Sequence, residues 1–264
     1  QSDTCTEPAA VNNLGHVVGL SGDDPGHAFF WSKAGGIQSL GNLPGDNMSF
    51  ATAISDADQV IGMSSLDFGA PHAFSWAPGH KMTPFFPIPG GGAETAVVAV
   101  NSRGQIAGSW TRGPYGFVYS HGYRAITGMK GIVGATPYGM NKYGTVVGYA
   151  FGPADTAYRP RGVAFKWTPD HGMVSLGRLP GTTYSVATAI SDSDQVVGYG
   201  GNLPGPVTTT AYPFVWTAKS GLVRLPLGPD VQGQATAISS TGRYITGTTT
   251  DSSGTAILVL WTKQ

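Results

Sequence analysis

A short phrase recurs six times along this chain of 264 residues. Its fullest form reads Ala-Ile-Ser-Asp-x-Asp-Gln-Val, followed by Val or Ile and then Gly, and it occupies residues 53–62 and 189–198. The six copies start near residues 10, 53, 99, 139, 189 and 237. Self-similarity at intervals of roughly 40 to 50 residues is typical of proteins built from one repeated supersecondary unit. The pattern therefore predicts a single repeat domain over residues 1–264.

An aromatic phrase follows each copy, and the two phrases together predict four strands per unit. The second phrase reads Phe-x-Trp or Phe-x-Tyr in the first five units and Val-Leu-Trp in the sixth. Its period of two places both rings on one face of a strand. A small apolar strand and a β-branched strand ending at Gly precede it, and a fourth strand such as residues 37–40 follows it.

The first two strands of each unit are joined by a short turn of the form Asn or Ser, two residues, then Gly or Asp. Examples are residues 12–15, 55–58 and 141–144. These residue types favour tight hairpins because they adopt positive φ or bond their own backbone. In two units the turn carries two aspartates, but calcium needs six to eight oxygen ligands. Asp is interpreted as a replacement for Gly at a turn position, and no metal site is predicted.

Six units of four strands predict an all-β fold, a six-bladed β-propeller with four-stranded antiparallel blades. No stretch has a sustained helical period, and 40 Gly and 19 Pro interrupt the chain. A parallel β-helix is the alternative, but its coils are usually shorter and lack paired tight hairpins. Ala or Gly at each repeat start predicts that the first strand is innermost. The tryptophans of the aromatic phrases are expected to be buried, at Trp31, Trp76, Trp167, Trp216 and Trp261.

The sixth unit ends soon after its aromatic phrase, at Gln264. Its blade is therefore expected to have three strands and to lack the outer one. An unpaired strand leaves backbone donors and acceptors on an edge that proteins usually protect. Either residues 1–5 cover this edge, or the blade stays three-stranded without a cover. We expect the three-stranded blade.

The repeat resembles the bacterial extracellular HAF repeats, which are named for His-Ala-Phe. That tripeptide stands intact at residues 27–29 and 72–74, and the accompanying Leu-Gly-x-Leu-Pro-Gly phrase stands at 40–45 and 176–181. The resemblance implies a secreted or surface protein with a propeller-like fold, and it carries no catalytic residues. The His position holds other residues in units three, four and six, so this His is not a residue shared by all repeats.

Composition excludes some classes of partner and favours an extracellular location. Formal net charge is zero, only 11% of residues are charged, and no basic run indicates nucleic-acid binding. No apolar stretch reaches the length of a membrane helix. A charge-poor, Gly-rich β-protein is typical of secreted proteins. Cys5 is the only cysteine and forbids an internal disulfide. We expect a monomer without a cofactor.

The loops between second and third strands vary widely, whereas the first turns are short and uniform. Variable loops on a rigid scaffold are where binding residues are usually placed. The predicted binding residues on these loops are Trp110, Arg112, Tyr115, Tyr158, Arg159 and Arg161. Trp110 is the only Trp outside the aromatic phrases and is expected to be exposed. Aromatic rings stack on sugars, and guanidinium groups bind carboxylate or sulfate through two hydrogen bonds. The alternative is that Trp110 caps a blade and that the arginines are a solvated loop tip.

His27 and His72 begin third strands at the inner edge of these loops, and they are weak catalytic candidates together with Tyr158 and Arg159. The competing interpretation is that both histidines are structural features of the repeat. The acids expected on the same face are Asp23, Asp24, Asp46, Asp67, Glu94, Asp155 and Asp230. No nucleophile motif, phosphate-binding loop, dinucleotide fingerprint or zinc spacing is present.

Three functions follow from these features. The favoured one is a secreted protein that binds a polysaccharide, a cell-surface glycan or another extracellular surface through the variable-loop face. The second is a polysaccharide lyase or glycoside hydrolase with its site at the central funnel. The third is a scaffold or inhibitor that docks a protein. Fold alone does not choose among them.

Overall fold

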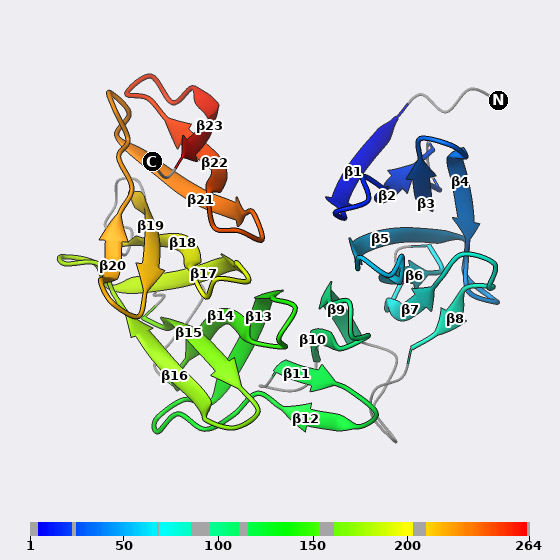
Figure 1. The fold of residues 1–264 in the computed structure, drawn as a ribbon, viewed down its shortest axis with the longest axis horizontal. Coiled ribbons are helices and arrows are strands. Elements are labelled where there is room, and N and C mark those ends of the chain that lie inside the picture. The colour runs from blue at the N-terminus through cyan, green and yellow to red at the C-terminus, as the bar shows by residue number, and fades with distance from the viewer. Residues whose placement is uncertain are drawn as a thin grey trace. The chain divides into compact units, whose positions relative to one another are not determined.

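The computed structural model describes residues 5–22, 25–67, 69–85, 95–110, 116–153, 161–202 and 210–262. The chain divides into two compact units, Gln1–Ala125 and Ile126–Gln264. The described residues form strands and turns, with no helix among them. Figure 1 shows the strands in blue to green for the first unit and in green to red for the second.

The first unit contains three four-stranded antiparallel sheets whose strands are neighbours in chain order. They are β1 Thr6–Val11, β2 Val17–Ser21, β3 His27–Ser32 and β4 Gly36–Gly41; β5 Met48–Ile54, β6 Val60–Ser65, β7 His72–Trp76 and β8 Thr83–Pro84; and β9 Thr95–Val100, β10 Ile106–Trp110, β11 Gly116–Tyr119 and β12 Tyr123–Ala125.

The second unit contains two four-stranded sheets and one three-stranded sheet of the same kind. They are β13 Gly134–Met140, β14 Val146–Phe151, β15 Val163–Thr168 and β16 Gly172–Gly177; β17 Tyr184–Ile190, β18 Val196–Gly201, β19 Ala211–Thr217 and β20 Gly221–Arg224; and β21 Gln232–Ile238, β22 Tyr244–Thr250 and β23 Ala256–Thr262. The prediction of five four-strand repeats and a sixth with three strands is confirmed.

Within each unit the first strands of successive sheets contact one another: β1 contacts β5, β5 contacts β9, β13 contacts β17 and β17 contacts β21. Threonine hydroxyls join these strands. Thr52 Oγ1 donates to the Val97 carbonyl at 3.1 Å, and Thr188 Oγ1 donates to the Ala235 carbonyl at 2.8 Å. The first strands are thus placed together within each unit, as predicted for innermost strands.

The glycine that ends each Val-Val-Gly phrase is required by a close approach of two backbones. A Cβ on Gly62 would collide with the Phe50 carbonyl and lie 2.6 Å from the Phe74 ring. A Cβ on Gly198 would collide with the Val186 carbonyl and lie 2.9 Å from the Phe214 ring. The register of the first two strands shifts beside these contacts, as in a β-bulge. The repeated glycine is therefore a packing requirement.

Phenylalanine, more than tryptophan, fills the core of the first five sheets. The third-strand phenylalanines Phe74, Phe117, Phe165 and Phe214 are fully buried. Trp76 and Trp167 are also buried, but Trp31, Trp216 and Trp261 are only half-buried. The prediction of five buried tryptophans is therefore wrong for three of them. Each Phe lies beside the close crossing of the first two strands, whereas the Trp lies two residues nearer the end of its strand.

Cys5 is exposed and has no disulfide. Residues 1–4, part of the predicted alternative cap for the sixth sheet, lie outside the described residues. No helix long and apolar enough to cross a membrane occurs in the described ranges.

Candidate functional site

The turns between first and second strands are held by their own first residue. Asn12 Oδ1 accepts hydrogen bonds from the backbone N–H groups of Leu14 at 3.1 Å and His16 at 3.0 Å. Asn101 and Asn141 hold their turns in the same way. Ser55 and Ser191 provide a hydroxyl instead. The side-chain oxygen satisfies backbone donors that the hairpin leaves unpaired.

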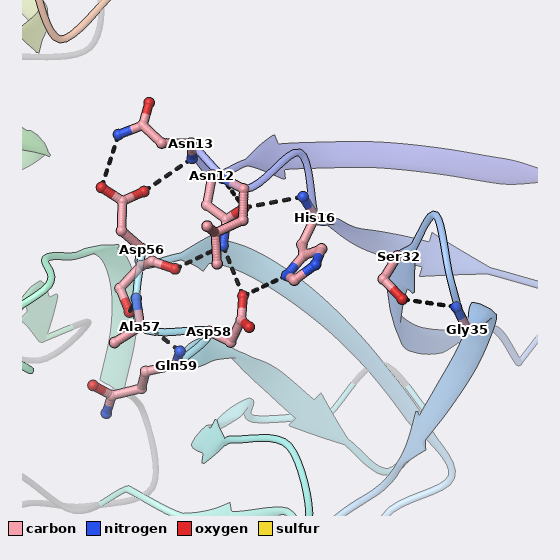
Figure 2. Close-up of polar contacts among 11 residues, drawn as sticks. Asn12, Asn13, His16, Ser32, Gly35, Asp56, Ala57, Asp58 and Gln59 are labelled. Carbon is pink, nitrogen blue, oxygen red and sulfur yellow. Dashed lines mark hydrogen bonds and ion pairs between the residues drawn. The ribbon is translucent and has the colours of Figure 1, made fainter.

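The turn of the second sheet is also bound by residues of the first sheet (Figure 2). Asn12 Nδ2 donates to the Ser55 carbonyl at 3.0 Å and to Asp58 Oδ1 at 2.8 Å. His16 Nδ1 lies 2.7 Å from the same Asp58 oxygen. Asp56 accepts from the backbone N–H of Asn13 at 2.9 Å and from its amide at 2.8 Å. Both aspartates of this turn therefore fasten two sheets together.

Two neighbouring sheets of the second unit are joined in a similar way, except that lysine ammonium groups contact the two aspartates of the turn. Asn141 Nδ2 donates to the Ser191 carbonyl at 3.2 Å. Lys142 contacts Asp192 through its backbone N–H at 3.1 Å and its ammonium at 3.4 Å. Lys166 Nζ lies 2.6 Å from Asp194 Oδ2.

The backbone explains why aspartate stands in these turns. Asp58 and Asp194 adopt φ values of 58° and 63°, where the other turns have Gly. The interpretation of Asp as a replacement for Gly is confirmed. Nowhere in the described ranges do three His, Cys, Asp or Glu side chains gather as metal ligands. We assign these hairpins a structural role.

The ends of the strands opposite the hairpin turns carry the loops between second and third strands and the connections between sheets, and we call this the loop-bearing side. In the first unit it holds a buried carboxylate next to a histidine. Asp46 lies in the β4–β5 connection, and its side chain is only 4% exposed. His72 begins β7, is 35% exposed, and places Nδ1 at 3.1 and 3.3 Å from the two Asp46 carboxylate oxygens. A carboxylate that accepts from Nδ1–H leaves Nε2 as the proton acceptor of a neutral imidazole. This pair has the arrangement of a general base with its orienting acid.

A second clasp fixes the same connection beside the pair. Asn47 Nδ2 donates to Asp67 Oδ1 at 2.7 Å, and the Asp67 backbone N–H donates to Asn47 Oδ1 at 3.0 Å. The Asn47 backbone N–H also donates to the Ser65 carbonyl at 3.1 Å. The β4–β5 connection and the β6–β7 loop are thus tied together, which holds Asp46 and His72 in place.

Aromatic residues gather at the corresponding loop-bearing side of the second unit. The Tyr149 and Phe151 rings stack with centroids 6.2 Å apart. The Tyr149 hydroxyl accepts from the Gly162 N–H at 3.0 Å. In the next sheet, Tyr184 and Tyr199 meet edge to face at 6.4 Å.

Three tyrosines of two neighbouring sheets form what we call the tyrosine cluster, which consists of Tyr138, Tyr184 and Tyr199. Burial raises the pKa of Tyr199 above its ordinary value, and the nearby Tyr138 and Tyr184 phenols raise it further. Burial also raises the pKa of Tyr184. Tyr138, on β13, is 47% exposed, whereas Tyr184 is buried. The cluster therefore combines one exposed tyrosine, Tyr138, with an edge-to-face pair, and all three hydroxyls stay protonated at neutral pH.

The structure places the predicted binding residues unevenly. Trp110 is half-buried and stacks on Tyr123 at 5.0 Å, so the expectation of a substantially exposed ring is wrong. It ends β10 and packs against the core of its own sheet. Arg161 is exposed, and its carbonyl accepts a hydrogen bond from Arg178. Arg112, Tyr115, Tyr158 and Arg159 lie outside the described residues.

Only some of the predicted catalytic and acidic residues come together in the structure. His72 meets Asp46, whereas His27 is half-buried at the start of β3 in the neighbouring sheet. Asp67 takes part in the clasp, and Asp230 lies in the β20–β21 connection of the other unit. Asp23, Asp24, Glu94 and Asp155 lie outside the described residues.

Sequence reasoning missed the tyrosine cluster and the partner of His72. Tyr184 follows the second Leu-Pro-Gly phrase by three residues, where Met48 stands in the second unit of the repeat. An alignment of the repeats against one another shows that Tyr184 replaces this methionine. Such an alignment also shows that Asp46 stands where the fifth repeat has Thr182.

Comparison with known proteins bears on the fold. No protein-family model matches the chain, and no curated protein matches it. Among solved structures, an oligogalacturonate lyase in complex with manganese has a TM-score of 0.63 at 10% identity, covering 100% of this chain and 78% of that one.

Two further solved structures are similar over the same length. The β-propeller domain of the Trilobed protease from Pyrococcus furiosus has a TM-score of 0.62 at 6% identity, covering 98% of this chain and 79% of that one. A catalytically inactive His-to-Ala variant of virginiamycin B lyase from Staphylococcus aureus, with quinupristin, has a TM-score of 0.58 at 13% identity, covering 100% and 87%. At such identities the likeness shows a β-propeller scaffold and nothing about activity.

Proposed function

We propose that this protein is a secreted, six-bladed β-propeller that binds carbohydrate through its loop-bearing side. The six repeats, the propeller-like relatives and the HAF-type phrases support the scaffold and the extracellular location. The hairpin turns are occupied by contacts between sheets, which leaves the loop-bearing side for a ligand. A polysaccharide or cell-surface glycan is the partner class that fits a surface with tyrosine rings.

The tyrosine cluster is the observation that carries this proposal. Sugar rings present flat faces of C–H groups and a rim of hydroxyls, and aromatic rings with polar tips suit both. Tyr138 is 47% exposed, and Tyr184 and Tyr199 beside it order each other by their edge-to-face contact. A ring that is already ordered loses less conformational entropy when a ligand binds.

A glycan array, followed by sedimentation with insoluble cell-wall polysaccharides, tests the proposed function. We expect saturable binding to at least one polysaccharide class. Removal of the Tyr138 ring in Tyr138→Ala is expected to weaken that binding about tenfold, which corresponds to about 1.4 kcal/mol. Tyr138→Phe keeps the ring and is expected to keep most of the affinity.

Tyr143 provides the matched control for this experiment. It is an exposed tyrosine of the same sheet, 53% accessible, but it lies in the hairpin turn that follows β13 and is not a member of the tyrosine cluster. Tyr143→Ala is expected to bind glycan like the unmodified protein. Equal losses in the two variants, or no binding to any glycan, would contradict the proposal.

The Asp46–His72 pair favours a second candidate, a lyase that cleaves uronate-containing polysaccharides. His72 Nε2 would remove the proton beside the sugar carboxylate, a carbon–carbon double bond would form as the glycosidic C–O bond breaks, and the released oxygen would take a proton from water. Asp46 would orient the imidazole and stabilise its protonated form.

The ultraviolet absorbance of the unsaturated product tests this second candidate. If the protein is a lyase, His72→Ala is expected to lower the rate by about a hundredfold or more, since general-base catalysis contributes that much. His80→Ala removes an exposed histidine in the turn between β7 and β8 and is expected to retain activity. A failure of the unmodified protein to release unsaturated products from uronate polysaccharides excludes the candidate.

A further inference from the structure

The guanidinium group of Arg224 lies over a tyrosine ring at the loop-bearing end of the fifth sheet. Arg224 ends β20, and its Cζ atom is 3.8 Å from the ring centroid of Tyr212 in β19. Tyr212 is half-buried and packs against the hydrophobic core of the fourth and fifth sheets. A cation at this distance from the face of an aromatic ring is attracted to it. The ring therefore holds the cation in place at the surface.

This cation has no counter-charge among the described residues. The Arg224 side chain is exposed, and its guanidinium group makes no hydrogen bond or ion pair within the described ranges. Two lysines of the same unit, in contrast, are paired with acids. Lys142 lies 3.4 Å from Asp192, and Lys166 lies 2.6 Å from Asp194. The N–H donors of Arg224 thus remain available to a ligand.

Comparison of the sheets shows that packing does not require an arginine here. Arg224 lies opposite Phe214, the buried phenylalanine of the third strand. In the other four-stranded sheets the residue opposite the corresponding phenylalanine is small or uncharged, as in Ser39, Pro84, Ala125 and Ser175. These residues complete the same pairing without a charge, so the guanidinium group is a feature of the fifth sheet alone.

The repeat positions around Arg224 differ from those that form the Asp46–His72 pair. Tyr212 stands at the repeat position of His72, and Thr182 stands at that of Asp46. The Thr182 hydroxyl donates to the Leu179 carbonyl at 2.8 Å. The fifth sheet therefore has a neutral residue where the second sheet has an acid, and this exchange removes a carboxylate that would compete for a nearby cation.

Arg224 belongs to the same sheet as two members of the tyrosine cluster. Tyr184 lies on β17 and Tyr199 on β18, and the strands follow the order β17-β18-β19-β20. Because the strands alternate in direction, the start of β17 and the end of β20 both lie at the loop-bearing end of the sheet. Three strand spacings separate β17 from β20, which is roughly 14 Å. A polysaccharide of several sugar units can span this distance.

We propose that Arg224, held by Tyr212, binds a carboxylate group of an acidic polysaccharide. A planar guanidinium group offers two parallel N–H donors, which match the two oxygens of a carboxylate. A side chain that is already ordered loses less conformational entropy when the ligand binds. The inference rests on the proposed binding of carbohydrate and adds the class of sugar, uronic acid units rather than neutral ones.

Polygalacturonate and alginate, each compared with its esterified form, serve as the probes. The two forms of each polymer share a sugar backbone, and esterification removes only the negative charge. The unmodified protein is expected to bind at least one acidic form about tenfold more tightly than its ester at low ionic strength. Equal affinity for both forms, or binding of neutral polysaccharides alone, overturns this inference and leaves the proposed function standing. Binding of no polysaccharide overturns both.

Dextran sulfate distinguishes a carboxylate site from a general attraction to polyanions. The unmodified protein is expected to bind it more weakly than the acidic polymer selected above. Tighter binding of dextran sulfate overturns the assignment of a carboxylate. Both comparisons use the unmodified protein, so they do not depend on the folding of a variant.

Arg224→Gln removes the charge and keeps a polar side chain. It is expected to weaken binding of the acidic polymer about tenfold and to leave binding of the ester unchanged. Arg243→Gln is the matched control, because Arg243 also lies over a tyrosine, Tyr244 at 5.4 Å, but belongs to the turn between β21 and β22. The control is expected to bind like the unmodified protein, and equal losses in the two variants contradict a site at Arg224.

Discussion

Gly198→Ala is expected to cost about 3 kcal/mol or more of the free energy of unfolding, the largest loss among the single substitutions considered. The added Cβ would collide with the Val186 carbonyl of the first strand and lie 2.9 Å from the Phe214 ring. Neither obstacle is the free end of a flexible side chain. The carbonyl belongs to a paired strand, and Phe214 is fully buried. The backbone of the first strand must therefore move.

Urea unfolding followed by tryptophan fluorescence measures this loss. Gly122→Ala is the matched control, because a Cβ there meets nothing within 4 Å and the residue does not have a positive φ. That control is expected to stay within about 0.5 kcal/mol of the unmodified protein. If Gly198→Ala is as stable as Gly122→Ala, the glycine of the repeat is not a packing requirement.

Asn141→Ala is expected to cost about 3 kcal/mol of unfolding free energy. The side chain is only 5% exposed and accepts from the N–H groups of Tyr143 and Thr145 within its own turn. It also donates to the Ser191 carbonyl of the next sheet. Alanine leaves these groups without their partner, and each buried polar group left unsatisfied costs about 1 to 3 kcal/mol.

Asn141→Ser separates the two roles of this side chain. The chain itself uses serine at this position in two other turns, where the hydroxyl accepts from backbone N–H groups. The variant is expected to lose about 1 kcal/mol, the value of the bond between sheets. Asn202→Ala changes an exposed asparagine and is expected to be neutral. Equal losses for Asn141→Ser and Asn141→Ala would show that the turn does not depend on a side-chain acceptor.

The fold could be predicted from the sequence because its rules are local and repeated. The residue types of a turn such as Asn12 to Gly15 indicate its conformation directly. Comparison of the repeats shows that Asp58 stands at the position of Gly15, and both residues have a positive φ. The alternation of Phe and Trp fixes the face of each third strand. The short final repeat predicted the three-stranded sheet that ends with β23.

The candidate site depends on contacts between repeats, and no local pattern encodes these contacts. Asp46 and His72 are 26 residues apart and come together because β5 and β7, which lie on either side of β6, run in the same direction and begin on the same side of the sheet. Tyr138 and Tyr199 belong to different sheets. Trp110 was expected to be exposed because it stands outside the aromatic phrase, but Tyr123, on the last strand of the same sheet, covers it. The sequence around Trp110 does not show that a ring from another strand stacks on it.

Hydrogen–deuterium exchange with a saturating polysaccharide ligand, selected on the array, tests the central claim that the loop-bearing side binds carbohydrate. Slower exchange is expected in residues 42–47 and 66–71 or in the segments around Tyr184 and Tyr199. The hairpin turns at residues 12–15, 55–58, 141–144 and 191–194 are expected to exchange at the rate of the free protein. Protection confined to these turns, with none on the loop-bearing side, would contradict the account.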